Sequence, residues 1–122
     1  MGCACQNDQE TRLLYACSGA ANTGLLSDQV ARKLARDGEG SMTCLAAVGA
    51  ELSGFFTSAR SVDKNIVIDG CPVACGKKIF EAKGLPYRHF IMTEFGVEKG
   101  KTVISGDVID GVSDELSLRL KA

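Results

Sequence analysis

Four of the six cysteines fall at intervals that could bring their thiols together. Cys44 lies 27 residues after Cys17, and Cys71 lies 27 residues after Cys44. A strand, its crossover helix and the return to the next strand take about 30 residues, so these cysteines would occupy similar points in successive βα units. Cys75 follows Cys71 by four residues, which is one helical turn. We therefore expect four thiols to converge at the edge of a parallel sheet where the strands end.

Four converging thiols are a common donor set for zinc, which takes them tetrahedrally at Zn–S distances of about 2.3 Å. Backbone amides and the start of a helix near Cys71 would favour the thiolate forms. The spacing thus predicts a zinc site, structural or used for metal transfer, with Cys17, Cys44, Cys71 and Cys75 as ligands. An iron–sulfur cluster also uses four cysteines, but the usual ferredoxin spacings are absent.

Two other interpretations of the cysteines stay open. Cys71, at the start of a helix, could be a low-pKa nucleophile or a persulfide carrier, resolved by Cys75, Cys44 or an N-terminal thiol. A single reactive thiol would not need this convergence, so the spacing favours metal. The cysteines could also pack as small apolar side chains of an interaction module. The sequence does not decide whether the protein is an enzyme.

Other residues with chemical potential give weaker signals. His89 is the single histidine, and it alternates with apolar neighbours in YRHFIMTEF, which is typical of a strand residue. Asp69 could orient a thiol or bind a metal, or the Asp-Gly pair could simply form a turn. The glycines of CSGAANTG lack the Lys-Ser/Thr of a phosphate-binding loop and indicate a turn.

Apolar segments of strand and helix type alternate along the chain. The pattern predicts a small three-layer α/β fold, in which helices cover both faces of a mostly parallel sheet of four or more strands. The expected strands are residues 11–19, 41–49, 65–69 and 87–95. The expected helices are residues 25–38 with Ser27 as N-cap, residues 50–60, residues 73–84, and an amphipathic helix after Ser105.

Length and composition bound the remaining choices. The 122 residues suffice for one domain, expected over residues 11–122, behind a flexible arm of residues 1–10 that carries Cys3 and Cys5. That thiol pair could capture or deliver a soft metal. A net charge of −1 gives no electrostatic case for nucleic acid or for an anionic membrane surface as partner.

The expected compartment is the cytoplasm. No apolar stretch approaches the roughly 20 residues of a membrane span, and the polar N-terminus lacks the features of a signal peptide. Cysteines in a reducing compartment more often bind metal or act in catalysis than form disulfides.

The segment IDGCPVACGKK (68–78) resembles the core of the DGC-domain family, which is named for its Asp-Gly-Cys. ACSGAANTGLLSDQVARKLARDG (16–38) is similar to the family's opening segment and TEFGVEKGK (93–101) to a later one. Members are described as candidate zinc-binding proteins with a four-cysteine site. By position, the resemblance implies that Cys17, Cys44, Cys71 and Cys75 form this site, with zinc as the bound partner. It implies no particular activity.

Overall fold

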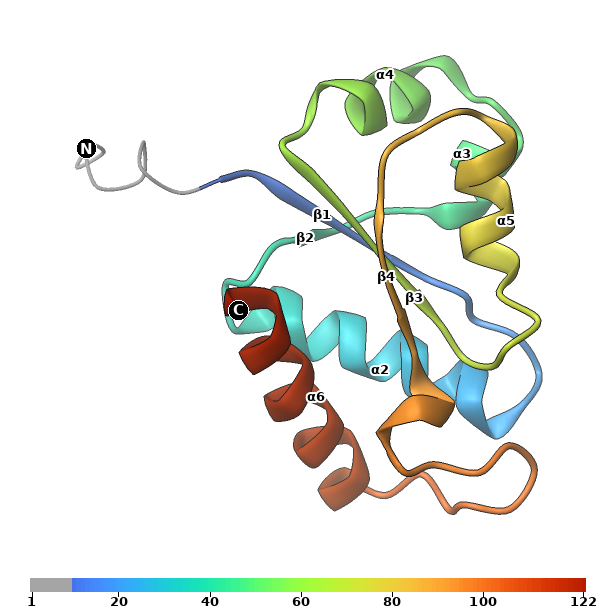
Figure 1. Cartoon of the computed structure of the whole chain (residues 1–122), viewed down its shortest axis with the longest axis vertical. Helices are drawn as coiled ribbons and strands as arrows, with labels where there is room; N and C mark the ends of the chain where they lie inside the picture. Colours follow the sequence, from blue (N-terminus) through green and yellow to red (C-terminus); the bar gives the residue numbers. More distant parts are fainter. Residues whose placement is uncertain (1–9) are drawn as a thin grey trace.

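A four-stranded parallel sheet forms the centre of the molecule (Figure 1). The computed structural model describes residues 10–122. The sheet has the order β2-β1-β3-β4, and each neighbouring pair of strands is parallel. The strands are β1 (Arg12–Ala16), β2 (Ser41–Met42), β3 (Lys64–Asp69) and β4 (Arg88–Ile91).

Helices cover both faces of this sheet, which confirms the predicted three-layer α/β fold (Figure 1). One face carries α2 (Asn22–Arg36) and α6 (Gly106–Lys121). The other carries α3 (Leu45–Gly49), α4 (Ser53–Ser61) and α5 (Cys75–Ala82). A short 3-10 helix, η1 (Met92–Phe95), follows β4. Within residues 10–122, no helix is long and apolar enough to cross a membrane.

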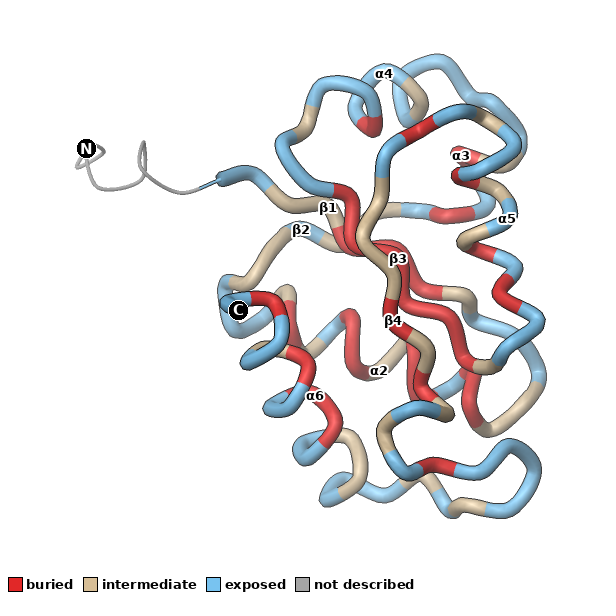
Figure 2. The backbone as a smooth tube through the Cα atoms, in the orientation of Figure 1, coloured by how far each residue is buried: buried red, intermediate tan, exposed pale blue. Residues whose placement is uncertain are grey.

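Buried residues concentrate along the central strands (Figure 2), and alternate residues of these strands supply two separate cores. Leu14 and Ile66 point to the side of α2 and α6, where Leu116 also packs. Tyr15 points to the opposite face, where its ring meets Phe80 of α5 edge-on at 4.8 Å. This strict alternation fixes the register of the sheet, because a slip of one residue would exchange the two faces. The fixed register also determines where each strand ends and where the residues after it lie.

Several expectations about the elements were wrong in detail, and the expected strand 11–19 ends at Ala16. The segment 41–49 is a two-residue strand followed by α3, not one strand. Ser27 is not an N-cap, because α2 begins at Asn22 and buries Ser27 in its interior. The expected strand 87–95 ends at Ile91 and continues as η1. Most of the predicted arm, including Cys3 and Cys5, lies outside the described residues.

Candidate thiol site

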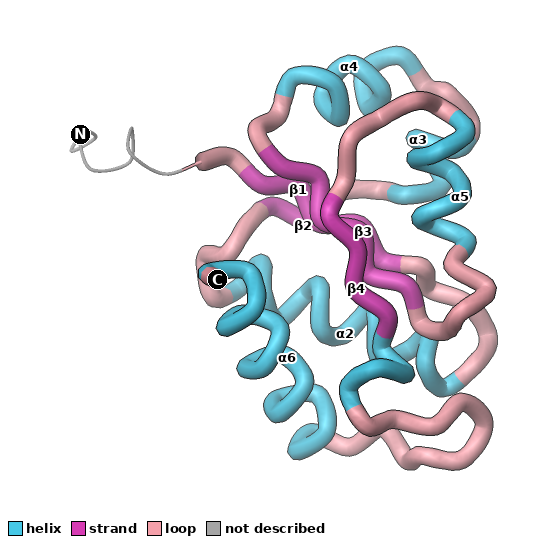
Figure 3. The backbone as a smooth tube through the Cα atoms, in the orientation of Figure 1, coloured by secondary structure: helices cyan, strands magenta, loops and turns pink. Residues whose placement is uncertain are grey.

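The loops after β1 and β3 lie side by side where these strands end (Figure 3). Cys17 follows β1 directly, and its backbone N–H donates to the carbonyl of Ile68 in β3 at 3.0 Å. Cys71 stands two residues after the end of β3. The parallel pairing of two neighbouring strands therefore brings together cysteines that are 54 residues apart in the sequence.

Three of the predicted cysteines line one cavity of about 230 Å³. We call this cavity the thiol pocket. It is bounded by Cys17, Cys71 and Cys75, by Asp69 and Lys99, and by small residues of the two loops, namely Gly19, Ala20, Ala21, Gly24, Gly70, Val73 and Ala74. Cys17 and Cys71 are partly buried, and Cys75 is exposed.

Cys44 stands apart from these three residues. It follows β2, the outer neighbour of β1, and it is the exposed N-cap residue of α3. It therefore belongs to the same edge of the sheet but does not line the thiol pocket. The four-cysteine ligand set stays a prediction.

The turn between Cys71 and Cys75 has a constrained backbone. Ala74 adopts left-handed dihedral angles (φ 56°, ψ 50°), which are uncommon for a residue with a side chain. Its N–H donates to the carbonyl of Cys71 at 3.0 Å, and α5 begins at Cys75. Cys75 is thus the first residue of the helix, whereas the sequence pattern placed it a turn further along. The tight turn directs both thiols into the same pocket.

Asp69 anchors this turn to the sheet. Its carboxylate is 1% exposed and accepts hydrogen bonds from the backbone N–H groups of Gly76 (2.8 Å) and Lys77 (3.0 Å) in the first turn of α5. His89 on β4 places Nε2 2.6 Å from the same carboxylate. Asp69 therefore does more than form an Asp-Gly turn: it satisfies the free amides at the start of α5, which have no partner within the helix.

Two glycines allow the loops of the pocket to touch. A Cβ atom on Gly70 would lie 2.8 Å from the backbone carbonyl of Thr23, and one on Gly24 would lie 2.6 Å from the backbone nitrogen of Gly19. Ser27, buried in α2, places its hydroxyl 2.6 Å from the carbonyl of Cys17. The first turn of α2 is therefore packed directly against both cysteine-bearing loops.

The three thiols lie in unequal electrostatic surroundings. Burial raises the pKa of the Cys17 thiol to about 11, and the nearby Asp69 carboxylate and the Cys75 and Cys71 thiols act in the same direction. The free Cys17 side chain is thus a neutral thiol near pH 7. Cys71 instead faces a cation, since Lys99 Nζ lies 3.4 Å from its sulfur.

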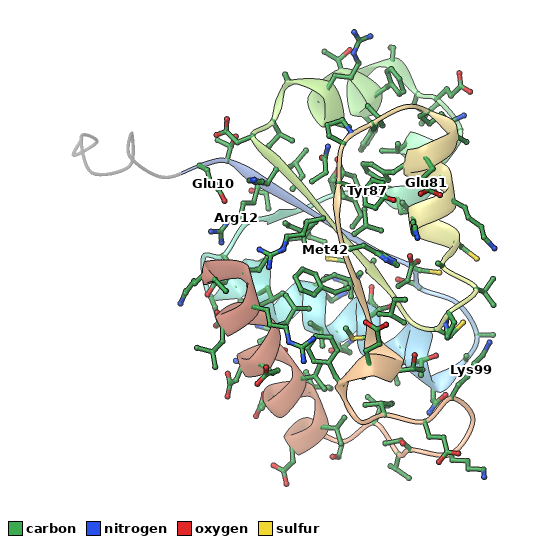
Figure 4. All side chains as sticks on the ribbon, viewed as in Figure 1. Glu10, Arg12, Met42, Glu81, Tyr87 and Lys99 are labelled. Carbon is green, nitrogen blue, oxygen red and sulfur yellow. The ribbon has the colours of Figure 1, made fainter. Side chains whose placement is uncertain are left out.

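Lys99 comes from the loop after η1, a part of the chain that the sequence patterns did not connect with the cysteines (Figure 4). Asn22, the first residue of α2, holds this loop. Its amide nitrogen donates to the carbonyls of Glu98 (3.1 Å) and Thr102 (2.8 Å), and its carbonyl oxygen accepts from the N–H of Gly100 at 2.7 Å. The segment TEFGVEKGK held the only sequence signal for this loop, and only as part of a resemblance.

The donor chemistry of the pocket suits a soft metal ion. Among residues 10–122, three thiols and no competing free carboxylate line it, because both oxygens of Asp69 are occupied. Thiolate is the ligand that favours Zn²⁺ and Cu⁺ over Mg²⁺ or Ca²⁺. Across residues 10–122, however, no three His, Cys, Asp or Glu side chains are already arranged as metal ligands. Metal binding would therefore require the thiols to move together, as is common when binding and local ordering are coupled.

Comparison with known proteins gives a family match over most of the chain. The family model of the DGC domain matches residues 13–116. The chain is also 33% identical, over 93 residues, to a Pseudomonas aeruginosa protein described as the anaerobic and virulence modulator AnvM. That alignment covers 75% of this chain and 71% of the relative. No solved structure matches the chain.

Proposed function

The chain belongs to the DGC-domain family, and from this premise we propose that it binds a soft divalent metal ion, with zinc as the first choice, through Cys17, Cys71 and Cys75. The observation that carries this proposal is the meeting of three thiols at one cavity. They come from the ends of two neighbouring parallel strands and from the first residue of a helix.

The position of Cys44 bears on the use of the metal. Structural zinc sites are closed by four protein ligands, whereas sites that exchange or activate a ligand keep one position open. Cys44 is exposed and lies outside the thiol pocket, so the arrangement supports an open three-thiol site. We therefore favour metal transfer in the reducing cytoplasm over a purely structural role. The alternative is the four-cysteine site predicted from the sequence, in which Cys44 would be the fourth ligand.

The surrounding residues would hold such a site in shape. Asp69 fixes the start of α5 and with it Cys75, while His89 ties that carboxylate to β4. Ser27 fixes the carbonyl of Cys17. Zinc bound here would supply a Lewis-acidic centre with an exchangeable fourth position.

Zinc content of cysteine variants tests the proposal. The full chain with Cys3→Ser and Cys5→Ser is purified anaerobically, exposed to excess zinc, dialysed and analysed for metal. We expect about one zinc per chain, and a clear loss in the Cys17→Ser, Cys71→Ser and Cys75→Ser variants. Cys44→Ser is the matched control and should keep its zinc if the site is open. Reduced protein without zinc, or full zinc in all three pocket variants, would refute the proposal.

Thiol chemistry at Cys71 is the second candidate, and one contact favours it. The Lys99 ammonium lies 3.4 Å from the sulfur of Cys71, and reactive cysteines lie in electropositive, partly exposed surroundings of this kind. This candidate predicts that the metal-free protein reacts fastest at Cys71, which alkylation with peptide mass spectrometry would identify. Faster alkylation at Cys75 or Cys17 would exclude it.

A further inference from the structure

Lys99 gives the thiol pocket a fixed positive charge. Its ammonium lies 3.4 Å from the sulfur of Cys71, and it is the one cationic side chain among the described residues that line the pocket. The one carboxylate there, Asp69, is 1% exposed and already engaged by two backbone N–H groups and His89. Among the described residues, a ligand that enters the pocket therefore meets one cation and no free carboxylate.

The place of Lys99 is defined by the fold even though its side chain is exposed. Asn22 makes three hydrogen bonds to the backbone of the loop that carries it, at 2.7 to 3.1 Å. Thr102 adds a fourth, since its hydroxyl accepts from the N–H of Glu98 at 2.8 Å. The next lysine along, Lys101, pairs instead with exposed Glu98 and does not line the pocket.

The walls of the pocket limit the size of a ligand. Apart from the thiols, Asp69 and Lys99, they consist of glycine, alanine and one valine, and the volume is about 230 Å³. Sites for drug-sized ligands are larger, at roughly 300–1,000 Å³. The space therefore suits a ligand smaller than a typical drug molecule.

We propose that the thiol pocket accepts a small anionic thiol, whose charged group meets Lys99 and whose sulfur binds the metal held by the cysteines. Lys99 is then the residue that selects for negative charge, and Asn22 is its positioning residue. This inference rests on the proposed function. With zinc held by the three cysteines, the sulfur of the ligand would replace the water in the fourth position and the thiol proton would pass to solvent, with no change in oxidation state.

A pair of alkylating probes tests the charge selection without any metal. Iodoacetate and iodoacetamide are similar in size, and with each the sulfur of Cys71 displaces iodide from a carbon atom. The ratio of the two rates reports local charge, because the thiolate fraction affects both rates equally. We expect Lys99→Met to lower the ratio about fivefold, the effect of unit charges some 4 Å apart in water. Lys101→Met, on the same loop, is the matched control. An unchanged ratio in Lys99→Met overturns the inference.

Thiol binding to the zinc-loaded full chain tests the ligand class. Thioglycolate is compared with its neutral counterpart 2-mercaptoethanol by calorimetric titration. We expect thioglycolate to bind about fivefold more tightly, with the preference absent in Lys99→Met, reduced in Asn22→Ala and kept in Lys101→Met. Equal binding of the two thiols, or a preference that survives Lys99→Met, contradicts the inference and leaves the metal site untouched. Failure to load zinc at all would instead refute the proposed function.

Discussion

The carboxylate of Asp69 ties three elements to one point beside the cysteines. Asp69 is the last residue of β3. Its carboxylate accepts hydrogen bonds from two backbone N–H groups of α5 and contacts His89 of β4. A buried carboxylate is costly unless it is fully hydrogen-bonded, and here both of its oxygens are. The Asp of the Asp-Gly-Cys segment is thus a structural support for the thiol next to it.

Replacing Asp69 should therefore destabilise the whole domain. In the Asp69→Ala variant the amides of Gly76 and Lys77 lose their acceptor, and we expect a loss of about 2–4 kcal/mol in the free energy of unfolding. Urea denaturation followed by circular dichroism measures it. Glu115→Ala removes a carboxylate from an exposed pair with Arg119 and should cost less than about 0.5 kcal/mol. Equal losses in the two variants would contradict this account of Asp69.

Tyr15 should make the fold sensitive to alkali. Its ring is fully buried, its hydroxyl donates to Asn65, and burial raises its pKa from 10.0 to about 12. The unfolded chain ionises first, so the stability that the neutral phenol contributes is complete below pH 10 and is lost as the pH rises toward 12. We expect Tyr15→Phe to lose less stability than the wild type over this range in urea titrations. Parallel curves for the two proteins would show that Tyr15 does not contribute.

At the scale of elements, the thiol pocket depends on loops that approach each other at backbone distance. Gly70 places the turn after β3 against Thr23 and Gly24 at the start of α2. Any side chain there would push the two loops apart. The glycine in Asp-Gly-Cys is therefore explained by contact between loops.

The Gly70→Ala variant tests this explanation. Its methyl group would meet backbone atoms at 2.8 Å, so we expect lower stability and weaker zinc binding, because Cys71 moves away from Cys17. Gly111→Ala is the matched control. A Cβ atom there meets nothing within 4 Å, and the variant should gain about 0.5–1 kcal/mol because alanine favours the helix. A Gly70→Ala protein with unchanged stability and zinc affinity would contradict the loop-contact explanation.

The sequence predicted the alternation of strands and helices better than the residues at which they begin and end. The strand at β3 and the terminal helix after Ser105 followed from clear apolar patterns. The run before Gly49 was assigned wrongly because a short apolar segment fits a strand or a helix equally well. The start of α2 was missed because Ala21 offers no capping side chain.

At the scale of the whole molecule, topology explains which part of the site could be predicted. The sheet order places β1 beside both β2 and β3, as the equal 27-residue intervals had assumed. Lys99 and Asn22 could not be found in this way. Their contacts join residues 28 and 78 positions apart through a loop with no regular pattern.

The thiols should contribute unequally to thermal stability of the zinc-loaded chain. We expect Cys71→Ser or Cys75→Ser to lower the Tm relative to the wild type, since a ligand that binds only the folded state stabilises it. The double variant Cys3→Ser, Cys5→Ser should melt like the wild type. Differential scanning calorimetry makes the comparison. Equal losses from the N-terminal and pocket variants would place the N-terminal thiols in the site.

X-ray absorption at the zinc edge tests the central claim most directly. The zinc-loaded chain carrying Cys3→Ser and Cys5→Ser leaves only the four predicted cysteines as thiol donors. We predict a first shell of three sulfur atoms at about 2.3 Å and one lighter atom, with one sulfur lost in Cys17→Ser and none lost in Cys44→Ser. A shell of nitrogen and oxygen atoms without sulfur, or a sulfur count that does not change in Cys17→Ser, would contradict a metal site at the thiol pocket.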